Sequence, residues 1–528
     1  MVKDYIFKKR YMLWYMLCFF ALGVIDQRRG SADGRIQMAA SNCVGIVIAA
    51  MLLPSVNKEK FKNKVYYWWT AFAVICGTLV GVWGWQNWRY RGQWITGVLN
   101  VMVWSYLVIY MIRERKSANI SRNLKRPFFW CLSLMFLLMF FSIHEGILPL
   151  WMLFIFGGFY LLGIPSHLRE DYLLGLLNGI IMWFFVQQTI AFGFRPYDYP
   201  RYRGLYAGET QNGIFYMMAY CAFLCKWLWT KEKGSHRVLS GFYFFMSAGS
   251  ISFMLFTGGR SSLMGVAVVT FMAYLLYYIV YKKSFYKWLI RVAALGLCVV
   301  LLFPVVYGTI RYLPLILHHP IWFAGEYSDE TSIRSFDPWN SDRYVSFEEA
   351  VDTNIGRILV MFGIDIHKWN NDEARLPWSL KVYAKEVIDP GSDPEHPYVP
   401  VEIDPDNSIA IRKYIYKYYF THLNLMGHSK ENGNFYFMSG VYGHAHNLLL
   451  QMAHDYGIIV GLLFLGLIIY CFIRLFRRMA NGISEGSWII FVFVTAIFVY
   501  GMTEVALIHG MITWALLYCC LCLAGAEE

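Results

Sequence analysis

Long stretches of apolar residues recur along this chain, and they constrain its fold more than any other feature. Hydrophobic residues make up 57% of the 528 positions and charged residues only 16%, too few charges to cover a soluble globule of this size. A helix that crosses a bilayer needs about 20 mostly apolar residues. We expect spans at about 11–26, 36–54, 65–85, 94–112, 127–141, 147–164, 171–193, 211–230, 238–256, 261–281, 290–308, 456–473, 487–504 and 507–524. The sequence therefore predicts an all-α polytopic membrane protein with about 12–14 transmembrane helices.

The net charge of +12 is distributed as in a membrane protein, and it does not indicate a nucleic-acid partner. Most of the 47 Lys and Arg residues lie in segments that alternation assigns to one side of the membrane, and such an excess marks the cytoplasmic side. Both termini are therefore expected in the cytoplasm. The basic start, Lys8-Lys9-Arg10, precedes an apolar run with no A-x-A site, which predicts an uncleaved first helix.

One connection, residues 309–445, is far longer than the others and is assigned to the opposite, extracytoplasmic side. It is rich in proline, and acidic residues outnumber basic ones. Residues 408–425 lack Pro and Gly and predict a helix. This loop either contacts sugars or forms a solvated lid. We expect four regions: N-terminal spans at 1–193, spans with arginine-bearing outer loops at 194–308, the large loop with helices at 309–447, and C-terminal spans at 448–528.

The eleven cysteines all fall in or beside predicted spans, so no disulfide framework is expected. No internal repeat is visible, which disfavours transporters built from duplicated halves. Polar side chains gather where spans end on the outer side, whereas the middle of the spans contains almost no ionisable residues. These residues are His144, Glu145, Gln187, Gln188, Glu504 and His509. Each could simply anchor a helix end, but together they indicate an active outer face.

Arginines mark two of the three polar segments that stand out at this face. Residues 195–212 include Arg201 and Arg203, whose planar guanidinium groups suit phosphate oxygens, either of a substrate or of lipid headgroups. Arg260 lies in a tight turn, LFTGGRSSL, between two spans. A charge there should face an anion or a carboxylate, unless the turn only caps the next helix.

Histidines mark the third segment, GHAHNLLLQ, where the long loop returns to the membrane. A histidine such as His446 can act as a general base near neutral pH. His444 and His446 could also cap a helix or form a chance metal pair. No Cys or HExxH pattern accompanies them, so no metal site is expected.

Four segments, in order, resemble the O-antigen ligase/polymerase family of bacterial membrane glycosyltransferases. They are RYRGLYAGETQNGIFYMMAY, with Arg201, Arg203 and Asn212; LFTGGRSSLMG; NSIAIRKYIYKYYFTHLNLMGHSKENG, with Arg412; and GHAHNLLLQMAHDYGIIVGLLFL. The resemblance covers roughly residues 200–475. The chain departs from the family in a long insert at 309–406, so Arg343 and Arg357 compete with Arg412 for its role.

The resemblance implies a GT-C-type fold in the bacterial cytoplasmic membrane and a polyprenyl-diphosphate-linked glycan as donor. It implies that His446 is the catalytic histidine and that Arg260 and Arg412 bind the diphosphate. Further substrate contacts would come from Arg201, Arg203, Asn212, His444 and Asn447. The reaction would be inverting and would need no metal or other cofactor. A glycan or lipid-linked acceptor, membrane lipids and other polysaccharide-assembly proteins would be the partners.

Three functional alternatives stay open from the residues. The chain could polymerise repeat units or ligate a finished glycan, because both reactions use the same donor chemistry. A flippase for lipid-linked oligosaccharides would instead need a charged central cavity. A non-enzymatic assembly component would tolerate loss of His446 and Arg260.

Overall fold

The computed structural model describes most of the helical part of the chain. The residues that it leaves undescribed are 1–8, 28–33, 87–90, 145, 147, 196, 198–200, 207, 233, 235–236, 281–284, 318–344, 357–407, 430–434, 438–439, 443, 482–485, 505–511 and 527–528.

Helices occupy every apolar run that the sequence predicts. The first half contains α2 (Arg10–Gln27), α3 (Gly34–Leu52), α4 (Lys64–Gln86), α5 (Arg91–Arg113), α6 (Ala118–Leu124), α7 (Pro127–Phe140), α8 (Leu148–Met152), η5 (Leu153–Gly157), α9 (Gly158–Leu162) and α10 (Ser166–Phe194), with short 3-10 turns at Leu53–Ser55 and Lys58–Lys62. The second half contains α11 (Glu209–Glu232), α12 (Arg237–Phe256), α13 (Arg260–Val280), α14 (Phe285–Ile316), α15 (Phe347–Val351), η7 (Asp352–Gly356), α17 (Ser408–Thr421), α18 (Leu448–Tyr456), α19 (Ile458–Ala480), α20 (Ser487–Gly501) and α21 (Ile512–Gly525).

Six of the described helical segments are long and apolar enough to cross a membrane. They lie at Met38–Ser55, Gly92–Arg113, Ser166–Phe194, Arg237–Phe256, Phe285–Ile316 and Ile458–Ala480. Five more apolar helices are shorter. The prediction of a polytopic helical membrane protein is therefore confirmed. Each helix satisfies its own backbone hydrogen bonds, so it can lie in lipid without water.

The described part of the large loop contains one element that the all-α prediction did not include. Strands β1 (Phe435–Phe437) and β2 (Gly440–Tyr442) pair antiparallel, with Tyr436 opposite Val441. The helix expected at 408–425 is present, but it ends at Thr421. The loop also begins later than residue 309, because α14 continues to Ile316 despite Pro304 and Pro314.

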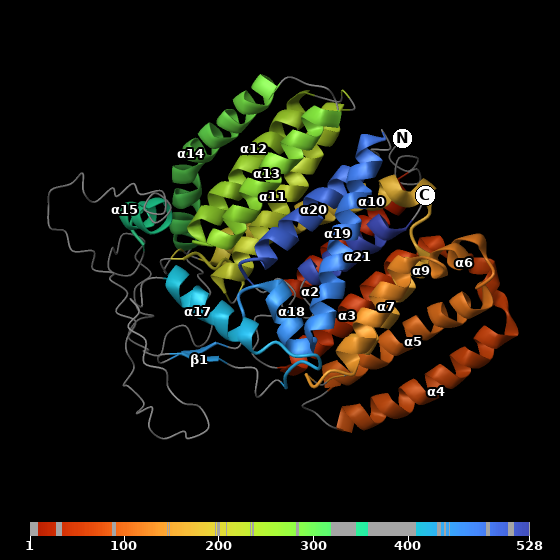
Figure 1. The fold of residues 1–528 in the computed structure, drawn as a ribbon. Helices are drawn as coiled ribbons and strands as arrows, with labels where there is room; N and C mark the ends of the chain where they lie inside the picture. The colour runs from red at the N-terminus through yellow and green to blue at the C-terminus, as the bar shows by residue number, and fades with distance from the viewer. Residues whose placement is uncertain are drawn as a thin grey trace, which may run out of the picture.

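Helix α11 lies at the centre of the second half. It packs against α10, α12, α13 and α20, and the figure shows these helices side by side in one bundle (Figure 1). Residues 212–225 of α11 are all buried. A helix that is apolar on every side fits such a buried position.

Several helix ends meet at one end of this bundle. Tyr202 N donates to Phe256 O at the end of α12, and Tyr197 N donates to Ile310 O of α14. The hydroxyl of Tyr500, near the end of α20, lies 3.5 Å from Thr210 O at the start of α11. We call this end of the bundle, which also contains Glu504 just beyond α20, the Glu504 end.

Candidate functional site

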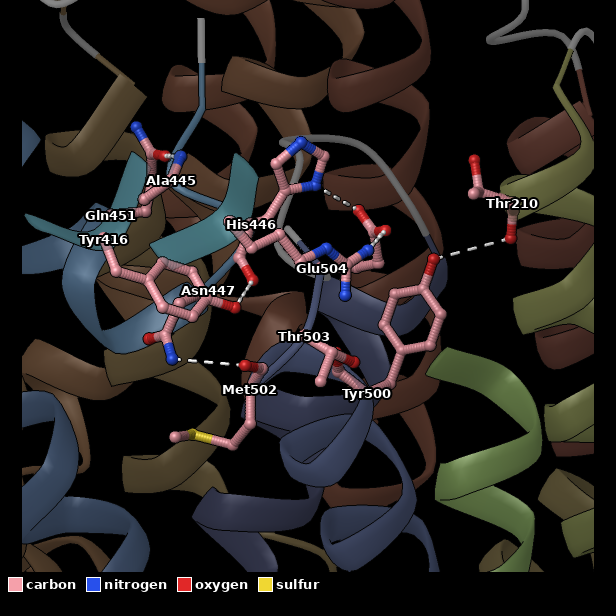
Figure 2. Close-up of polar contacts among 11 residues, drawn as sticks. Thr210, Tyr416, Ala445, His446, Asn447, Gln451, Tyr500, Met502, Thr503 and Glu504 are labelled. Carbon is pink, nitrogen blue, oxygen red and sulfur yellow. Dashed lines mark hydrogen bonds and ion pairs between the residues drawn. The ribbon is translucent and has the colours of Figure 1, made fainter. Parts of the chain in front are cut away.

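A single carboxylate joins two residues that are far apart in the sequence. Glu504 follows α20, and its Oε1 accepts a hydrogen bond from Nη2 of Arg412 on α17 at 2.9 Å. Its Oε2 lies 2.9 Å from Nδ1 of His446. Figure 2 shows the His446 ring and the Glu504 carboxylate pointing toward each other. The structure thus brings together two of the residues that the sequence singled out, through a third.

The ionisation of Glu504 fixes which nitrogen of His446 carries a proton. Burial alone would raise the pKa of the Glu504 carboxyl, but the hydrogen bond from His446 and the charges of His446 and Arg412 outweigh it and hold that pKa below its usual value. Glu504 is therefore ionised at neutral pH and can only accept. Nδ1 of His446 therefore donates to it, and whenever the imidazole is neutral Nε2 is the nitrogen with the free lone pair. This is the arrangement of a histidine poised to take up a proton.

The backbone at His446 is strained. His446 is the only non-glycine residue with positive φ in the described part of the chain, at 48°. Its carbonyl accepts a hydrogen bond from the Tyr416 hydroxyl at 3.2 Å. A residue other than glycine adopts this conformation only where its surroundings enforce it, and such residues concentrate at functional sites.

Asn447 holds this strained loop between two helices. Its Oδ1 accepts from Leu450 N at 3.0 Å, which caps the start of α18. Its Nδ2 donates to Met502 O at 3.2 Å, two residues before Glu504. Asn447 therefore fixes the distance between the segments that carry His446 and Glu504. The sequence predicted a substrate contact for Asn447, and the structure gives it these two protein contacts.

A second chain of hydrogen bonds supports the residue before His446. Ala445 N donates to Gln451 Oε1 at 2.5 Å, and Gln451 Nε2 donates to Asp455 Oδ2 at 2.6 Å. The other oxygen of Asp455 lies 3.1 Å from Nδ1 of His454, which is 1% exposed. Since each partner is itself held, Gln451 has one amide orientation, and Ala445 N is fixed by it.

The arginine loop of residues 195–212 folds against the turn at 257–260. Nε of Arg201 donates to Thr257 O at 2.9 Å, and Nη2 of Arg203 lies 3.5 Å from the Glu209 carboxylate. Gly258 has a φ of +60°, and a Cβ there would lie 3.0 Å from Arg201 Nε. Only glycine fits such an approach without rearrangement, so this turn keeps Arg201 against the backbone.

Two predicted residues of this region have different surroundings. Asn212 is fully buried, and its Nδ2 donates to Tyr202 O at 3.2 Å. This bond holds the backbone of the arginine loop at Tyr202, and the substrate contact of Asn212 stays a prediction. Arg260 is exposed as the first residue of α13, and its backbone N donates to Gly258 O. The diphosphate contact of Arg260 stays a prediction.

Tyr500 connects the arginine loop with the Glu504 carboxylate. Its hydroxyl meets Thr210 O, two residues before Asn212 (Figure 2). The charged groups of Glu504, Arg201 and Arg412 lie near the same hydroxyl. The predicted arginine and histidine segments, which lie up to about 250 residues apart, thus meet around one residue.

His444 lies beside the catalytic candidate. Its ring centroid is 4.3 Å from that of His446, and its side chain is exposed. Loss of surrounding water and the neighbouring His446 lower the pKa of His444, while Glu504 opposes this in part. The first two effects favour the neutral imidazole of His444. One ligand atom from each of His444, His446 and Glu504 lies within 4.8 Å of the others, close enough to hold a metal ion.

Sequence reasoning placed Glu504 among the polar residues of the outer face but gave it no role at the site. Its position at the end of an apolar span was the available signal. The sequence also did not single out two almost fully buried arginines at the Glu504 end of the bundle, Arg195 and Arg311 (3% and 4% exposed). Arg343 and Arg357, the predicted competitors of Arg412, and Glu145 and His509 lie outside the described residues.

Comparisons with known proteins give no relative. The chain matches no protein-family profile, no curated protein and no solved structure.

Proposed function

We propose that this protein is a membrane glycosyltransferase that transfers a glycan from a polyprenyl-diphosphate donor to an acceptor hydroxyl. The observation that carries the proposal is the Glu504 carboxylate, which holds the imidazole of His446 and the guanidinium of Arg412 at 2.9 Å each. It places a proton acceptor next to a fixed positive charge. A transfer that deprotonates a hydroxyl and expels a diphosphate needs both.

His446 acts as the base. Its Nε2 takes the proton of the acceptor hydroxyl while the oxygen attacks the anomeric carbon of the donor sugar. The new bond to that carbon forms as its bond to the diphosphate oxygen breaks, which inverts the anomeric centre. Glu504 stabilises the resulting imidazolium by its negative charge, as the aspartate of a hydrolase triad does.

The arginines stabilise the leaving group. The diphosphate gains negative charge as the sugar leaves, and guanidinium groups fixed beforehand stabilise that charge in the transition state. Arg412 contacts the Glu504 carboxylate, and both Arg412 and Arg201 lie near the Tyr500 hydroxyl. Arg203 and Arg260 extend the positive surface from the neighbouring loop and turn. The reaction requires no metal, because charge stabilisation comes from these side chains.

The placement of the site fits a lipid-linked donor. The residues lie at helix ends of a largely apolar bundle, so the polyprenyl tail can remain in the bilayer while the diphosphate reaches the arginines. The four sequence segments that resemble the O-antigen ligase/polymerase family contribute Arg201, Arg260, Arg412 and His446. We assign the Glu504 end of the bundle to the extracytoplasmic face, in a GT-C-type arrangement with the 309–447 loop on that side.

The test is transfer by purified protein in liposomes that contain a polyprenyl-diphosphate oligosaccharide and an acceptor glycan. His446→Ala should lower the rate by about 10²–10⁴-fold, the usual contribution of a general base. His167→Ala is the matched control, because His167 is an exposed histidine at the start of α10, away from the Glu504 site. Product formation by His446→Ala at the wild-type rate would refute the proposed base.

The intermediate that accumulates in cells carrying His446→Ala separates the two forms of the reaction. Single repeat units on the lipid indicate a polymerase. Long chains that remain on the lipid indicate a ligase.

A further inference from the structure

Three potential metal ligands lie together at the proposed active site. Ligand atoms of His444, His446 and Glu504 all lie within 4.8 Å of one another. The closest pair, Nδ1 of His446 and Oε2 of Glu504, is 2.9 Å apart. Tetrahedral Zn²⁺ with bonds of about 2.0–2.2 Å spaces its ligand atoms by about 3.4 Å. The group is therefore close to the size that zinc requires.

For all three residues to bind one ion, the third ligand must move closer to the other two. The exposed His444 side chain is the one that can move. Its ring contacts the His446 ring, and among the described residues it has no hydrogen-bond partner. His446 and Glu504 are held by their neighbours, so they form the fixed part of the site. Because the His444 side chain is exposed, it can rotate about its side-chain bonds toward the other two ligands.

The ligand chemistry selects one class of ion. Two imidazoles and one carboxylate are the protein ligands of many zinc sites that keep one position open. Imidazole nitrogens favour Zn²⁺ and its neighbours in the first transition row, whereas Mg²⁺ prefers six oxygen ligands. Glu504 supplies the negative charge that a divalent ion needs.

We propose that His444, His446 and Glu504 form a Zn²⁺ site whose occupancy blocks the base. A bound ion takes the place of the proton on His446 and of the hydrogen bond between His446 and Glu504. The imidazole is then no longer oriented as a proton acceptor. The binding site rests on geometry alone, and only the inhibitory role rests on the proposed function.

Arg412 opposes binding and so provides a diagnostic variant. Its guanidinium lies 2.9 Å from Glu504 Oε1, on the oxygen that does not face His446. It is one-third exposed, so water screens its repulsion of a cation in part. Arg412→Gln removes this repulsion, which should tighten zinc binding about three- to tenfold. The same change removes a charge from the proposed diphosphate site and should slow transfer.

Isothermal titration of the purified full-length protein with ZnCl₂ tests the site. We expect one equivalent of zinc to bind, MgCl₂ to give no signal, and His444→Ala to weaken binding by at least about tenfold. Arg412→Gln should bind zinc more tightly than the wild type, and His167→Ala should bind it equally. An absence of zinc binding, or equal affinity in wild type and His444→Ala, would overturn the proposal.

The two proposals fail separately. Zinc binding that depends on His444, together with full transfer activity in His446→Ala, would leave the metal site standing and remove the catalytic role. Loss of activity in His446→Ala, together with no zinc binding by the wild type, would leave the catalytic role standing and remove the metal site.

Discussion

Glu504 shows what one carboxylate can do when it lies between an arginine and a histidine. It is 15% exposed, and it is held in the ionised form by His446 and Arg412. The sequence predicted His446 and Arg412 as functional but did not pair them. Glu504 lies 58 residues after His446 and 92 after Arg412. No periodicity links residues at such separations, so only the fold reveals the contact.

Glu504→Gln should lower the turnover rate by about 10²–10⁴-fold with normal protein levels. The amide of glutamine can accept or donate, so it no longer selects the tautomer of His446, and it carries no charge to stabilise the imidazolium. Glu504→Asp, which keeps the charge but shortens the reach, should retain more activity than Glu504→Gln. Turnover assays at saturating donor check this order. A Glu504→Gln rate within twofold of the wild type would contradict it.

The lowered pKa of Glu504 also predicts how stability depends on pH. A carboxyl group whose pKa is lower in the folded state stabilises the fold above its unfolded value, near 4.5. That contribution is lost as the pH falls through the folded pKa. The difference in melting temperature between wild type and Glu504→Gln should therefore shrink as the pH falls below about 4.5. Thermal unfolding in detergent between pH 7 and 3.5 measures it, and a difference that grows toward low pH would contradict the argument.

At the scale of elements, the junction between α18 and α19 fixes the site. Gly427 and Gly457, both with positive φ, bring two chain segments into backbone contact. A Cβ on Gly457 would lie 2.2 Å from Leu425 O, and one on Gly427 would lie 2.0 Å from Asp455 O. The helices could be predicted from hydropathy, but this crossing could not. It depends on an approach between segments about 30 residues apart.

Gly457→Ala should destabilise the protein by more than about 2 kcal/mol, because it combines a positive φ with a clash against backbone. Gly466→Ala on α19 is the matched control. It has open space around it and ordinary helical φ, so alanine there should be neutral or slightly stabilising. Melting temperatures in detergent distinguish the two. Equal melting temperatures would show that the junction adjusts without cost.

Gln451→Leu tests the hydrogen-bond chain behind His446. Leucine has a similar size but cannot accept from Ala445 N or donate to Asp455. We expect a fall in turnover with little change in the Michaelis constant for the donor, because the base is displaced while the arginines stay in place. A change confined to the Michaelis constant would mean that Gln451 acts on binding instead.

At the scale of the whole molecule, apolar periodicity predicts nearly all of the helices, because burial in a bilayer dictates their composition. It does not predict which helices pack together, since lipid-facing and helix-facing positions are equally apolar. Helix α4, with Trp68 and Leu79 among its exposed side chains, and the buried α11 both appear as apolar runs. The strand pair was missed because aromatic residues in a polar loop also fit irregular structure.

The orientation of the bundle is predicted from its basic loops. Lys116, between α5 and α6, should face the cytoplasm, and Thr421, at the end of α17, should face the other side. A membrane-impermeant maleimide added to intact cells should therefore label Thr421→Cys and not Lys116→Cys. The wild type is the background control, because its described cysteines are buried or half-buried. The reverse pattern of labelling would place the Glu504 site in the cytoplasm.

The central claim is that His446 and Glu504 act as one catalytic unit, and a double-mutant cycle tests it most directly. Initial rates of glycan transfer should be measured for the wild type, His446→Ala, Glu504→Gln and the double variant. If the Glu504 carboxylate acts through the His446 imidazole, removing the carboxylate lowers the transfer rate no further once the imidazole is gone. The double variant should then transfer glycan at the rate of His446→Ala alone. Losses that multiply in the double variant would show that the two residues act independently, and wild-type rates in His446→Ala would show that the pair is not catalytic.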